Sequence, residues 1–151
     1  MEITLSLNLP RDEESTSVAR HIVRKALAEV GVENDCTFDV ELALSEACTN
    51  VLLHAGPGEA YEVRLRIDER SCELRVVDVG RGFDTDGAPV QRSGVEEGGR
   101  GLGLMIALVD KVQFASRPEA GTVVSLEKAL VYREDSIGGR RLRGQETPAP
   151  P

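Results

Sequence analysis

The chain has 151 residues, of which 40% are hydrophobic and 29% are charged, and this balance is typical of one globular domain that folds by itself. Its formal net charge of −8 argues against a nucleic-acid or membrane-surface partner, because such polyanions bind basic patches and the one basic cluster lies at residues 140–143. The N-terminus has no basic leader and no apolar run approaches the roughly 20 residues of a transmembrane helix, so we expect a cytoplasmic protein.

The first third of the chain predicts one strand followed by two helices. Apolar and polar residues alternate over residues 3–9, which predicts a half-buried strand. Apolar residues recur at helical spacing over residues 12–30, and Gly31 stands where a C-terminal cap belongs. A second helix is expected from about residue 38 to residue 55, with Asn34 as a capping residue ahead of it.

The middle of the chain predicts a hairpin and then a long connection. Alternation over residues 61–67, a polar turn at 68–70 and an apolar run over 74–79 indicate two antiparallel strands. Residues 80–98 are rich in glycine and acids and show little periodicity. A connection of this length is uncommon unless it works as a functional lid or is disordered, and the lid interpretation requires a ligand.

The last third predicts a helix, a closing hairpin and a tail. Apolar residues at helical spacing over 102–109 are followed by two short strands at 112–115 and 122–126. The domain is expected to span residues 1–131. Residues 132–151 contain little apolar sequence, so we predict a mobile tail there.

These elements together predict an α+β fold. Consecutive strands are joined by hairpins, and three helices are interspersed among them. The expected architecture is a two-layer sandwich, with a mixed, mostly antiparallel sheet covered on one face by helices.

The second helix carries an unusual polar pair. On a helical wheel Leu44, Cys48 and Val51 share the apolar arc that faces a core, whereas Glu46 and Asn50 lie beside that arc and one turn apart. An unpaired carboxylate is costly in semi-apolar surroundings, and a hydrated metal ion would serve both groups. Incidental surface polarity explains the spacing equally well.

Two further motifs combine glycine with charge. Asp78 is followed by Gly80 and Gly82 at the end of an apolar strand, which suits close approach to a flat ligand or an ordinary turn. Residues 98–103, G-G-R-G-L-G, open a helix whose backbone N–H groups suit phosphate, although a glycine hinge fits nearly as well. Neither motif matches a dinucleotide-binding fingerprint or a P-loop.

The remaining reactive side chains point to structural roles. Cys36, Cys48 and Cys72 are odd in number and form no C-x-x-C, so three reduced thiols are expected. His54, one turn beyond Asn50, is expected to be a helix-end histidine and not a phosphate acceptor.

The joint occurrence of these motifs is far more specific than any one of them. E-A-C-T-N from Glu46, D-V-G-R-G from Asp78, G-R-G from Gly99 and Gly121-Thr122 occur in the order and spacing of an ATP-binding site. In this the chain resembles the GHKL superfamily of gyrases, heat-shock chaperones, histidine kinases and mismatch-repair ATPases. The S-E-A-C-T-N segment is similar to the bacterial anti-sigma factor serine/threonine kinases. The resemblance covers residues 3 to about 130 and implies the Bergerat fold.

The resemblance also implies a role for each motif residue. Glu46 would be the catalytic carboxylate, which orients or deprotonates the attacking hydroxyl, and Asn50 would hold the magnesium ion that bridges the phosphates. Asp78 would bind the adenine amino group with support from Thr122. The glycines that let the base pack closely would be Gly80 and Gly82.

The glycine box would hold the triphosphate beneath a lid formed by residues 80–98. Its phosphate-binding residues would be Gly99, Arg100 and Gly101. The G-R-G-L-G sequence can equally be framed on Gly101 and Gly103, and both framings remain open.

The implied function is an ATP-dependent serine/threonine kinase that acts as an anti-sigma factor. It would phosphorylate an anti-anti-sigma partner, sequester a sigma factor when that partner is unavailable, and work as a homodimer. The alternative is a non-catalytic GHKL module that uses ATP as a conformational ligand, and the presence of Glu46 favours the kinase. A detached chaperone or topoisomerase ATPase is disfavoured, because no transducer or dimerisation segment follows.

Overall fold

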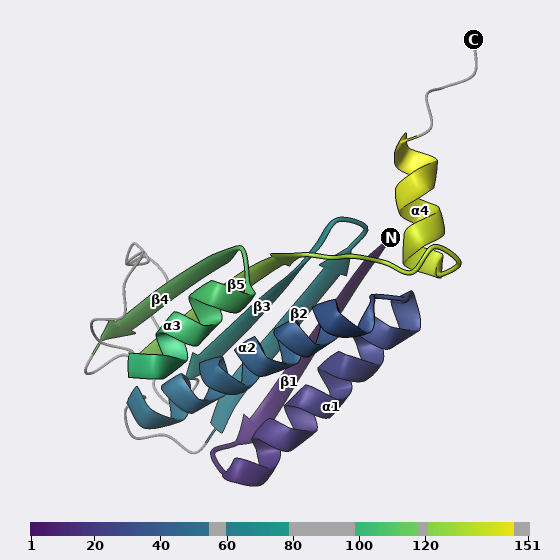
Figure 1. The fold of residues 1–151 in the computed structure, drawn as a ribbon. Coiled ribbons are helices and arrows are strands. Elements are labelled where there is room, and N and C mark those ends of the chain that lie inside the picture. The colour runs from purple at the N-terminus through teal and green to yellow at the C-terminus, as the bar shows by residue number, and fades with distance from the viewer. Residues whose placement is uncertain (55–59, 79–98, 118–120, 147–151) are drawn as a thin grey trace.

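The computed structural model describes residues 1–54, 60–78, 99–117 and 121–146, and for residues 54, 99–102, 116, 117, 121, 145 and 146 it describes the backbone alone. A five-stranded sheet with the order β1-β2-β3-β5-β4 forms one layer, and α1, α2 and α3 form the other on one face of it (Figure 1). The elements are β1 (Glu2–Pro10), α1 (Glu13–Val30), α2 (Asn34–His54), β2 (Ala60–Asp68), β3 (Ser71–Asp78), α3 (Gly99–Leu108), β4 (Lys111–Arg117), β5 (Gly121–Ala129) and α4 (Ile137–Glu146).

The predicted α+β sandwich is confirmed, with one difference in the sheet. Every neighbouring pair among the described strands is antiparallel, so the sheet is not mixed. The reason lies in the α1–α2 pair. Helix α1 runs along the sheet and α2 returns, so β2 starts at the end where β1 finishes and runs against it, in the ladder from Glu2↔Asp68 to Pro10↔Ala60.

Alternation along the strands decides which side chains meet the helices. In β2 every second residue from Tyr61 to Ile67 is buried, and in β3 the same holds from Cys72 to Asp78. These side chains share one core with the buried stripes of α1 and α2 and with Met105 of α3. The period of two therefore places one face of the sheet in the core and leaves the other face polar.

The two long helices meet at a tight turn built on Gly31. Asp12 caps the start of α1 by accepting a hydrogen bond from the Ser15 N–H at 2.8 Å, and Gly31 ends the helix with φ of +96°. Helix α2 then begins at Asn34, four residues earlier than the predicted start at residue 38, because the Glu33 carbonyl already accepts from the Thr37 N–H at 3.0 Å.

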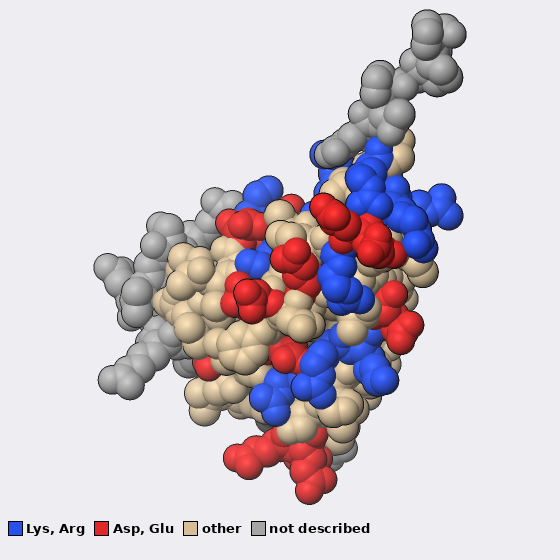
Figure 2. All heavy atoms as spheres, turned by 45° about the vertical axis from the view of Figure 1, so that its right-hand side comes forward, with Lys and Arg blue, Asp and Glu red and all other residues tan. Residues whose placement is uncertain are grey.

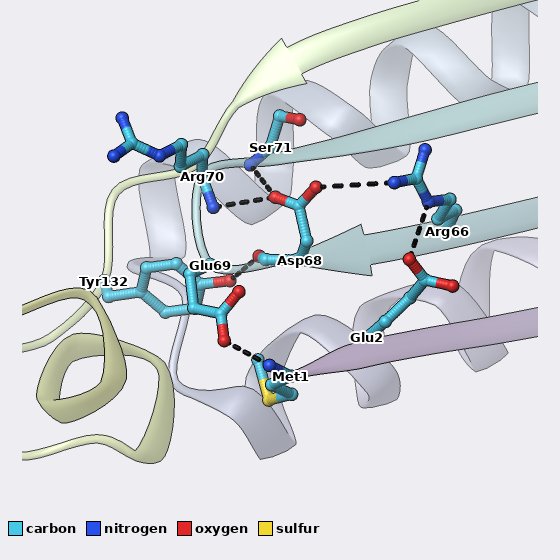
Figure 3. Close-up of polar contacts among 8 residues, drawn as sticks. All are labelled: Met1, Glu2, Arg66, Asp68, Glu69, Arg70, Ser71 and Tyr132. Carbon is cyan, nitrogen blue, oxygen red and sulfur yellow. Dashed lines mark hydrogen bonds and ion pairs between the residues drawn. The ribbon is translucent and has the colours of Figure 1, made fainter. Parts of the chain in front are cut away.

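The β2–β3 turn is fixed at the end of the sheet where the N-terminus lies (Figure 3). The Asp68 carboxylate accepts from the backbone N–H groups of Arg70 and Ser71, each at 2.8 Å, and the N-terminal amino group pairs with Glu69. The hydroxyl of Tyr132 donates to the Asp68 carbonyl at 2.6 Å. Residues far apart in the sequence are therefore joined at this end.

Residues 130–136, here called the C-terminal strap, begin inside the predicted domain of residues 1–131, continue into the predicted tail and contact the domain closely. The Glu33 N–H donates to the Val131 carbonyl at 2.8 Å, and Arg133 donates from its backbone N–H to the Gly31 carbonyl at 2.8 Å and from its guanidinium to the Val32 carbonyl at 3.1 Å. Leu130 and Tyr132 are buried. The strap thus ties the α1–α2 turn to the β2–β3 turn.

Helix α4 follows the strap and projects away from the sheet (Figure 1). Ser136 caps it by accepting from the Gly139 N–H at 3.0 Å. The exposed arginines Arg140, Arg141 and Arg143 make it the most basic element, and Figure 2 shows the blue side chains gathered on it. None of the helices in the described part of the chain is long and apolar enough to cross a membrane.

Candidate functional site

Helix α2 presents Glu46 and Asn50 toward different surroundings. Its core stripe is fully buried at Leu44, Ala47 and Val51, as the helical wheel predicts. Glu46 is half-buried, whereas Asn50 is only 4% exposed. The Asn50 side-chain nitrogen is buried and has no hydrogen-bond partner among the residues that the structure describes. A buried amide without a partner is costly, so this position is suited to a polar ligand.

The predicted base-recognition residues lie at one end of two neighbouring strands. Asp78 ends β3 and is 1% exposed, and Thr122 near the start of β5 is fully buried. The β3–β5 ladder finishes with Val77 opposite Val123, so the next residue of each strand is Asp78 and Thr122. The antiparallel register therefore brings a buried carboxylate and a buried hydroxyl to the same edge of the core.

The glycine box contributes the beginning of α3. Its backbone is helical from Gly99, so Gly99, Arg100, Gly101 and Gly103 all lie in the first turns of a helix that packs against α2. Figure 1 shows the end of α2, the end of β3 and the beginning of α3 at the same end of the sheet. N–H groups in the first turn of a helix are not used within the helix and suit an anionic group.

Several predictions fall on parts that the structure does not describe. Gly80, Gly82 and the lid at 80–98 lie outside the described residues, and the side chains of His54 and Arg100 are likewise not described. The glycine-box framing therefore stays as predicted.

Two clefts formed by described residues lie away from these side chains. A cleft of about 220 Å³ between α1 and α2 is lined by Arg20, Arg24 and Glu41 among others, and a second lies on the open face of the sheet near Arg75. Neither contains Asn50, Asp78 or Thr122. The candidate nucleotide site is therefore identified from the chemistry and burial of Asn50, Asp78 and Thr122.

The described side chains fit a magnesium ion that is shared with a ligand. Among them no group of three or more His, Cys, Asp or Glu could hold a metal alone. Magnesium at phosphate sites usually takes one or two protein oxygens and completes its shell with water and phosphate oxygens. The side-chain oxygen of Asn50, with Glu46 one turn away, supplies that kind of partial set. The partnerless Asn50 nitrogen is a donor, which suits an oxygen of a bound phosphate and not the ion itself.

All three cysteines are buried and free, as predicted. Burial raises the pKa of the Cys48 thiol to about 12, and burial also raises the pKa of the Cys72 thiol to about 12. Both therefore stay protonated at neutral pH, which excludes them as nucleophiles.

The profile of the histidine kinase-like ATPase domain matches residues 9–128, which is most of the chain and includes every predicted site residue. The chain belongs to the histidine kinase-like ATPase domain family. It is 31% identical to the serine-protein kinase RsbW of Halalkalibacterium halodurans, with 91% of this chain and 88% of that protein covered. It is also 32% identical to RsbW of Bacillus velezensis, covering 83% of this chain and 85% of that protein. With the anti-sigma F factor of Clostridium acetobutylicum it shares 25% identity over 89% of this chain and 99% of that protein.

A solved structure has the same fold. The RsbU and RsbW domains of a Mycobacterium tuberculosis protein superpose with a TM-score of 0.57 at 19% identity, covering 85% of this chain and 32% of that one. The resemblance and the fold predicted from the sequence are thereby confirmed. The relatives also confirm the enzyme class, a serine/threonine protein kinase of the histidine kinase-like ATPase family, and the family implies ATP as its nucleotide.

Two buried polar residues next to the site were not singled out from the sequence. Tyr61 lies opposite Asp78 in the β2–β3 ladder, and its hydroxyl lies 2.7 Å from Ser15 Oγ. A hairpin turn at 68–70 already places residues near 61 opposite residues near 78. The link to Ser15 depends on how α1 packs, which no local pattern indicates.

Proposed function

We propose that this protein is an anti-sigma factor that phosphorylates a serine or threonine of an anti-anti-sigma protein with ATP and magnesium. The observation that carries the proposal is the placement of Glu46 and Asn50 one turn apart on α2, beside the end of the sheet that holds Asp78 and Thr122. This arrangement places a hydrogen-bond acceptor for the adenine base, Asp78, and a carboxylate that can accept a proton from the substrate hydroxyl, Glu46, at the same end of one domain.

Each described residue would contribute a separate part of the transfer. Asp78, supported by Thr122, would accept the amino group of adenine, and the first turn of α3 would bind phosphate oxygens. Asn50 would hold magnesium, which neutralises phosphate charge when bound. Glu46 would accept the proton of the partner's hydroxyl as its oxygen bonds to the γ-phosphorus, while the bond from that phosphorus to ADP breaks.

The expected partners follow from the relatives. Proteins named serine-protein kinase and anti-sigma F factor both match this chain over most of their length. A sigma factor and an anti-anti-sigma protein are accordingly the proposed partners, in the cytoplasm. We propose a homodimer as the working unit, because a single small domain would then present a composite surface to either partner.

The decisive experiment is a transfer assay with radiolabelled ATP, magnesium and purified anti-anti-sigma candidates encoded nearby. The wild-type protein should label one candidate on serine or threonine, and Glu46→Gln should not. Glu73→Gln is the matched control, since Glu73 is exposed on β3 away from the site. If ATP binds but no candidate is labelled, the proposed phosphorylation of an anti-anti-sigma protein is refuted.

Oligomeric state is tested separately by sedimentation at micromolar concentration, with and without ATP. A dimer supports the proposed working unit. A monomer under both conditions rules it out and leaves the kinase proposal unaffected.

A further inference from the structure

Strand β1 is an edge of the sheet whose apolar side is left open. It pairs with β2 along one side, and no strand in the described part of the chain pairs with its other side. All of its helix-facing side chains are only half-buried, although each lies opposite a β2 residue that is at most 1% exposed. These side chains are Ile3, Leu5, Leu7 and Leu9. The hydrophobic core therefore extends to this edge and is not closed there by any described residue.

Helix α1 extends the same apolar surface above the strand. It packs over β1 (Figure 1), and its core stripe faces the sheet. The neighbouring row of Val18, Ile22 and Ala26 is spaced by four residues and so lies in one line along the helix. Val18 is 47% exposed, and the other two are half-buried. The four strand residues and these three helix residues form one apolar surface, here called the β1–α1 edge.

The β1–α1 edge lacks the features that keep edge strands apart. Natural proteins protect such strands with charges, bulges, prolines or short length, because their unpaired backbone N–H and C=O groups can bind another strand. Residues 3–9 carry no charge, and the β1–β2 ladder continues without a bulge along the whole strand. The other edge strand, β4, is shorter and begins with the exposed Lys111. Strand β1 is therefore the edge that is suited to pairing.

The residue pattern along β1 is complementary to itself. An antiparallel pair of β1 strands about a two-fold axis at Ser6 places Leu5 opposite Leu7 of the second copy. The same register places Ile3 opposite Leu9. Apolar residues then meet apolar residues on the helix side, and the two Ser6 residues meet on the open side. The pairing brings no like charges opposite each other, which is what destabilises strand pairs.

One axis serves the strand and the helix together. Helix α1 starts near the end of β1, because Ser15 contacts Tyr61, which pairs at that end, and it then runs back along the strand. Its length is about 27 Å, close to the roughly 30 Å of β1. The middle of α1, at Ile22, therefore lies over the middle of β1, and the same axis brings Ile22 of the two copies together.

We infer that the β1–α1 edge is the interface between two copies of this chain, which join their sheets through β1 and pack their α1 helices together. The inference rests on the proposed homodimer and names its surface. A strip about 30 Å long and two layers high, about 20 Å, has a footprint of roughly 600 Å², which is comparable to the roughly 800 Å² that each partner buries in a specific interface. A second copy matches both layers at once, whereas a strand from another protein would match β1 alone.

Two charge variants of the full chain test the strand and the helix. Ser6→Lys places two lysines opposite each other in the dimer, yet in the monomer the new side chain lies in solvent beside Glu62. Val18→Glu puts a carboxylate into the apolar row of α1. Each should raise the dimer Kd about tenfold or more, measured by sedimentation over a concentration series. Circular dichroism and a cooperative melt check that both variants fold.

The matched controls add the same charges outside the β1–α1 edge. Gln113→Lys lies on β4, the other edge strand, and Ser17→Glu changes the exposed neighbour of Val18 on α1. Both should keep the dimer Kd within about twofold of the wild-type value, as surface substitutions away from an interface do.

Disulfide capture locates the axis directly. Residues directly opposite in an antiparallel pair have Cα atoms about 4.5–5.5 Å apart, which lies within the range that a disulfide spans. Ser6→Cys should therefore give a covalent dimer on mild oxidation, whereas Gln113→Cys should not. The three native cysteines are buried, so the introduced thiol is the accessible one.

The outcomes separate this interface from the homodimer and from the kinase. If the wild type is a dimer but Ser6→Lys and Val18→Glu dimerise normally, or Ser6→Cys forms no covalent dimer, the interface lies elsewhere and the inference is overturned while the homodimer stands. A wild type that is monomeric at all concentrations overturns both and leaves the kinase to the transfer assay. Ser6→Cys that cross-links only to an anti-anti-sigma candidate would likewise overturn the inference, because a strand of that protein would then occupy the edge.

Discussion

Tyr61 of β2 and Asp78 of β3 lie directly opposite each other in the antiparallel ladder, and both side chains are buried in the core beneath the helices. The pair places a buried carboxylate next to a ring whose hydroxyl is hydrogen-bonded to Ser15 of α1. The end of β3 is therefore held by β2 and, through the Tyr61 hydroxyl, by α1. A rigid acceptor is what discrimination between bases requires.

Asp78→Ala should weaken ATP binding at least tenfold. A lost hydrogen bond to a charged group costs about 1.5–3 kcal/mol, and the variant should also lose its preference for ATP over GTP, because guanine presents a carbonyl where adenine presents its amino group. Titration with both nucleotides measures this, with Glu73→Ala on the exposed face of β3 as control. Identical ATP curves for Asp78→Ala and the wild type would refute the assignment.

Glu46 and Asn50 should separate catalysis from binding. Glu46→Gln keeps the size of the side chain and should still bind ATP, yet transfer phosphate about a hundredfold more slowly or worse, because the proton acceptor is gone. Asn50→Ala should lose magnesium-dependent binding, and its remaining affinity should not respond to magnesium. Single-turnover transfer and calorimetry with and without magnesium measure these effects. Wild-type transfer by Glu46→Gln would mean that another group accepts the proton.

The C-terminal strap should stabilise the domain, whereas α4 should not. A chain that ends at Ala129 loses the burial of Leu130 and Tyr132, each worth about 1.5–3 kcal/mol, together with the bonds from the strap to the α1–α2 turn. We expect its Tm to fall by about 10 °C or more. A chain that ends at Ser136 should melt within about 3 °C of the full chain. Calorimetry compares the two, and equal Tm values would show that the strap adds nothing.

Acid should destabilise the β2–β3 turn. Burial acts to raise the pKa of Asp68, but hydrogen bonds from the Ser71 and Arg70 N–H groups outweigh it and hold the pKa below its ordinary value. A hydrogen bond from the N-terminal amino group also lowers the pKa of Glu69. Because these pKa values are lower in the folded state, the stability they give is present above the ordinary carboxyl range and is lost as the pH falls through the folded values.

The matched variant for this effect is Asp68→Asn, which keeps an oxygen for the two backbone donors and removes the titration. Between neutral pH and about pH 3, the Tm of the wild type should fall more steeply than that of the variant. Parallel curves would mean that Asp68 does not contribute to acid unfolding.

The amino-acid sequence by itself determined the order and type of the elements from β1 to β5 and the polar pair on α2, whereas α4 lies in the segment that the sequence predicts to be a mobile tail. Helical and strand periodicity are local properties, so the wheel position of Glu46 and Asn50 and the hairpin around residues 68–70 could be read without the fold. The order and spacing of the motifs then carried the family resemblance, which the match over residues 9–128 confirms.

Only the tertiary structure decided how deeply these residues are buried and which distant segments meet. The burial of Asn50 requires α3 and the sheet to close around α2, and the approach of Asp78 to Thr122 depends on β5 joining β3 before β4. The strap shows the same limit. Residues 132–136 are mostly polar, and composition averages over the whole segment. One buried ring at Tyr132 and its bond to Asp68, 64 residues earlier in the chain, nevertheless fix the segment in place.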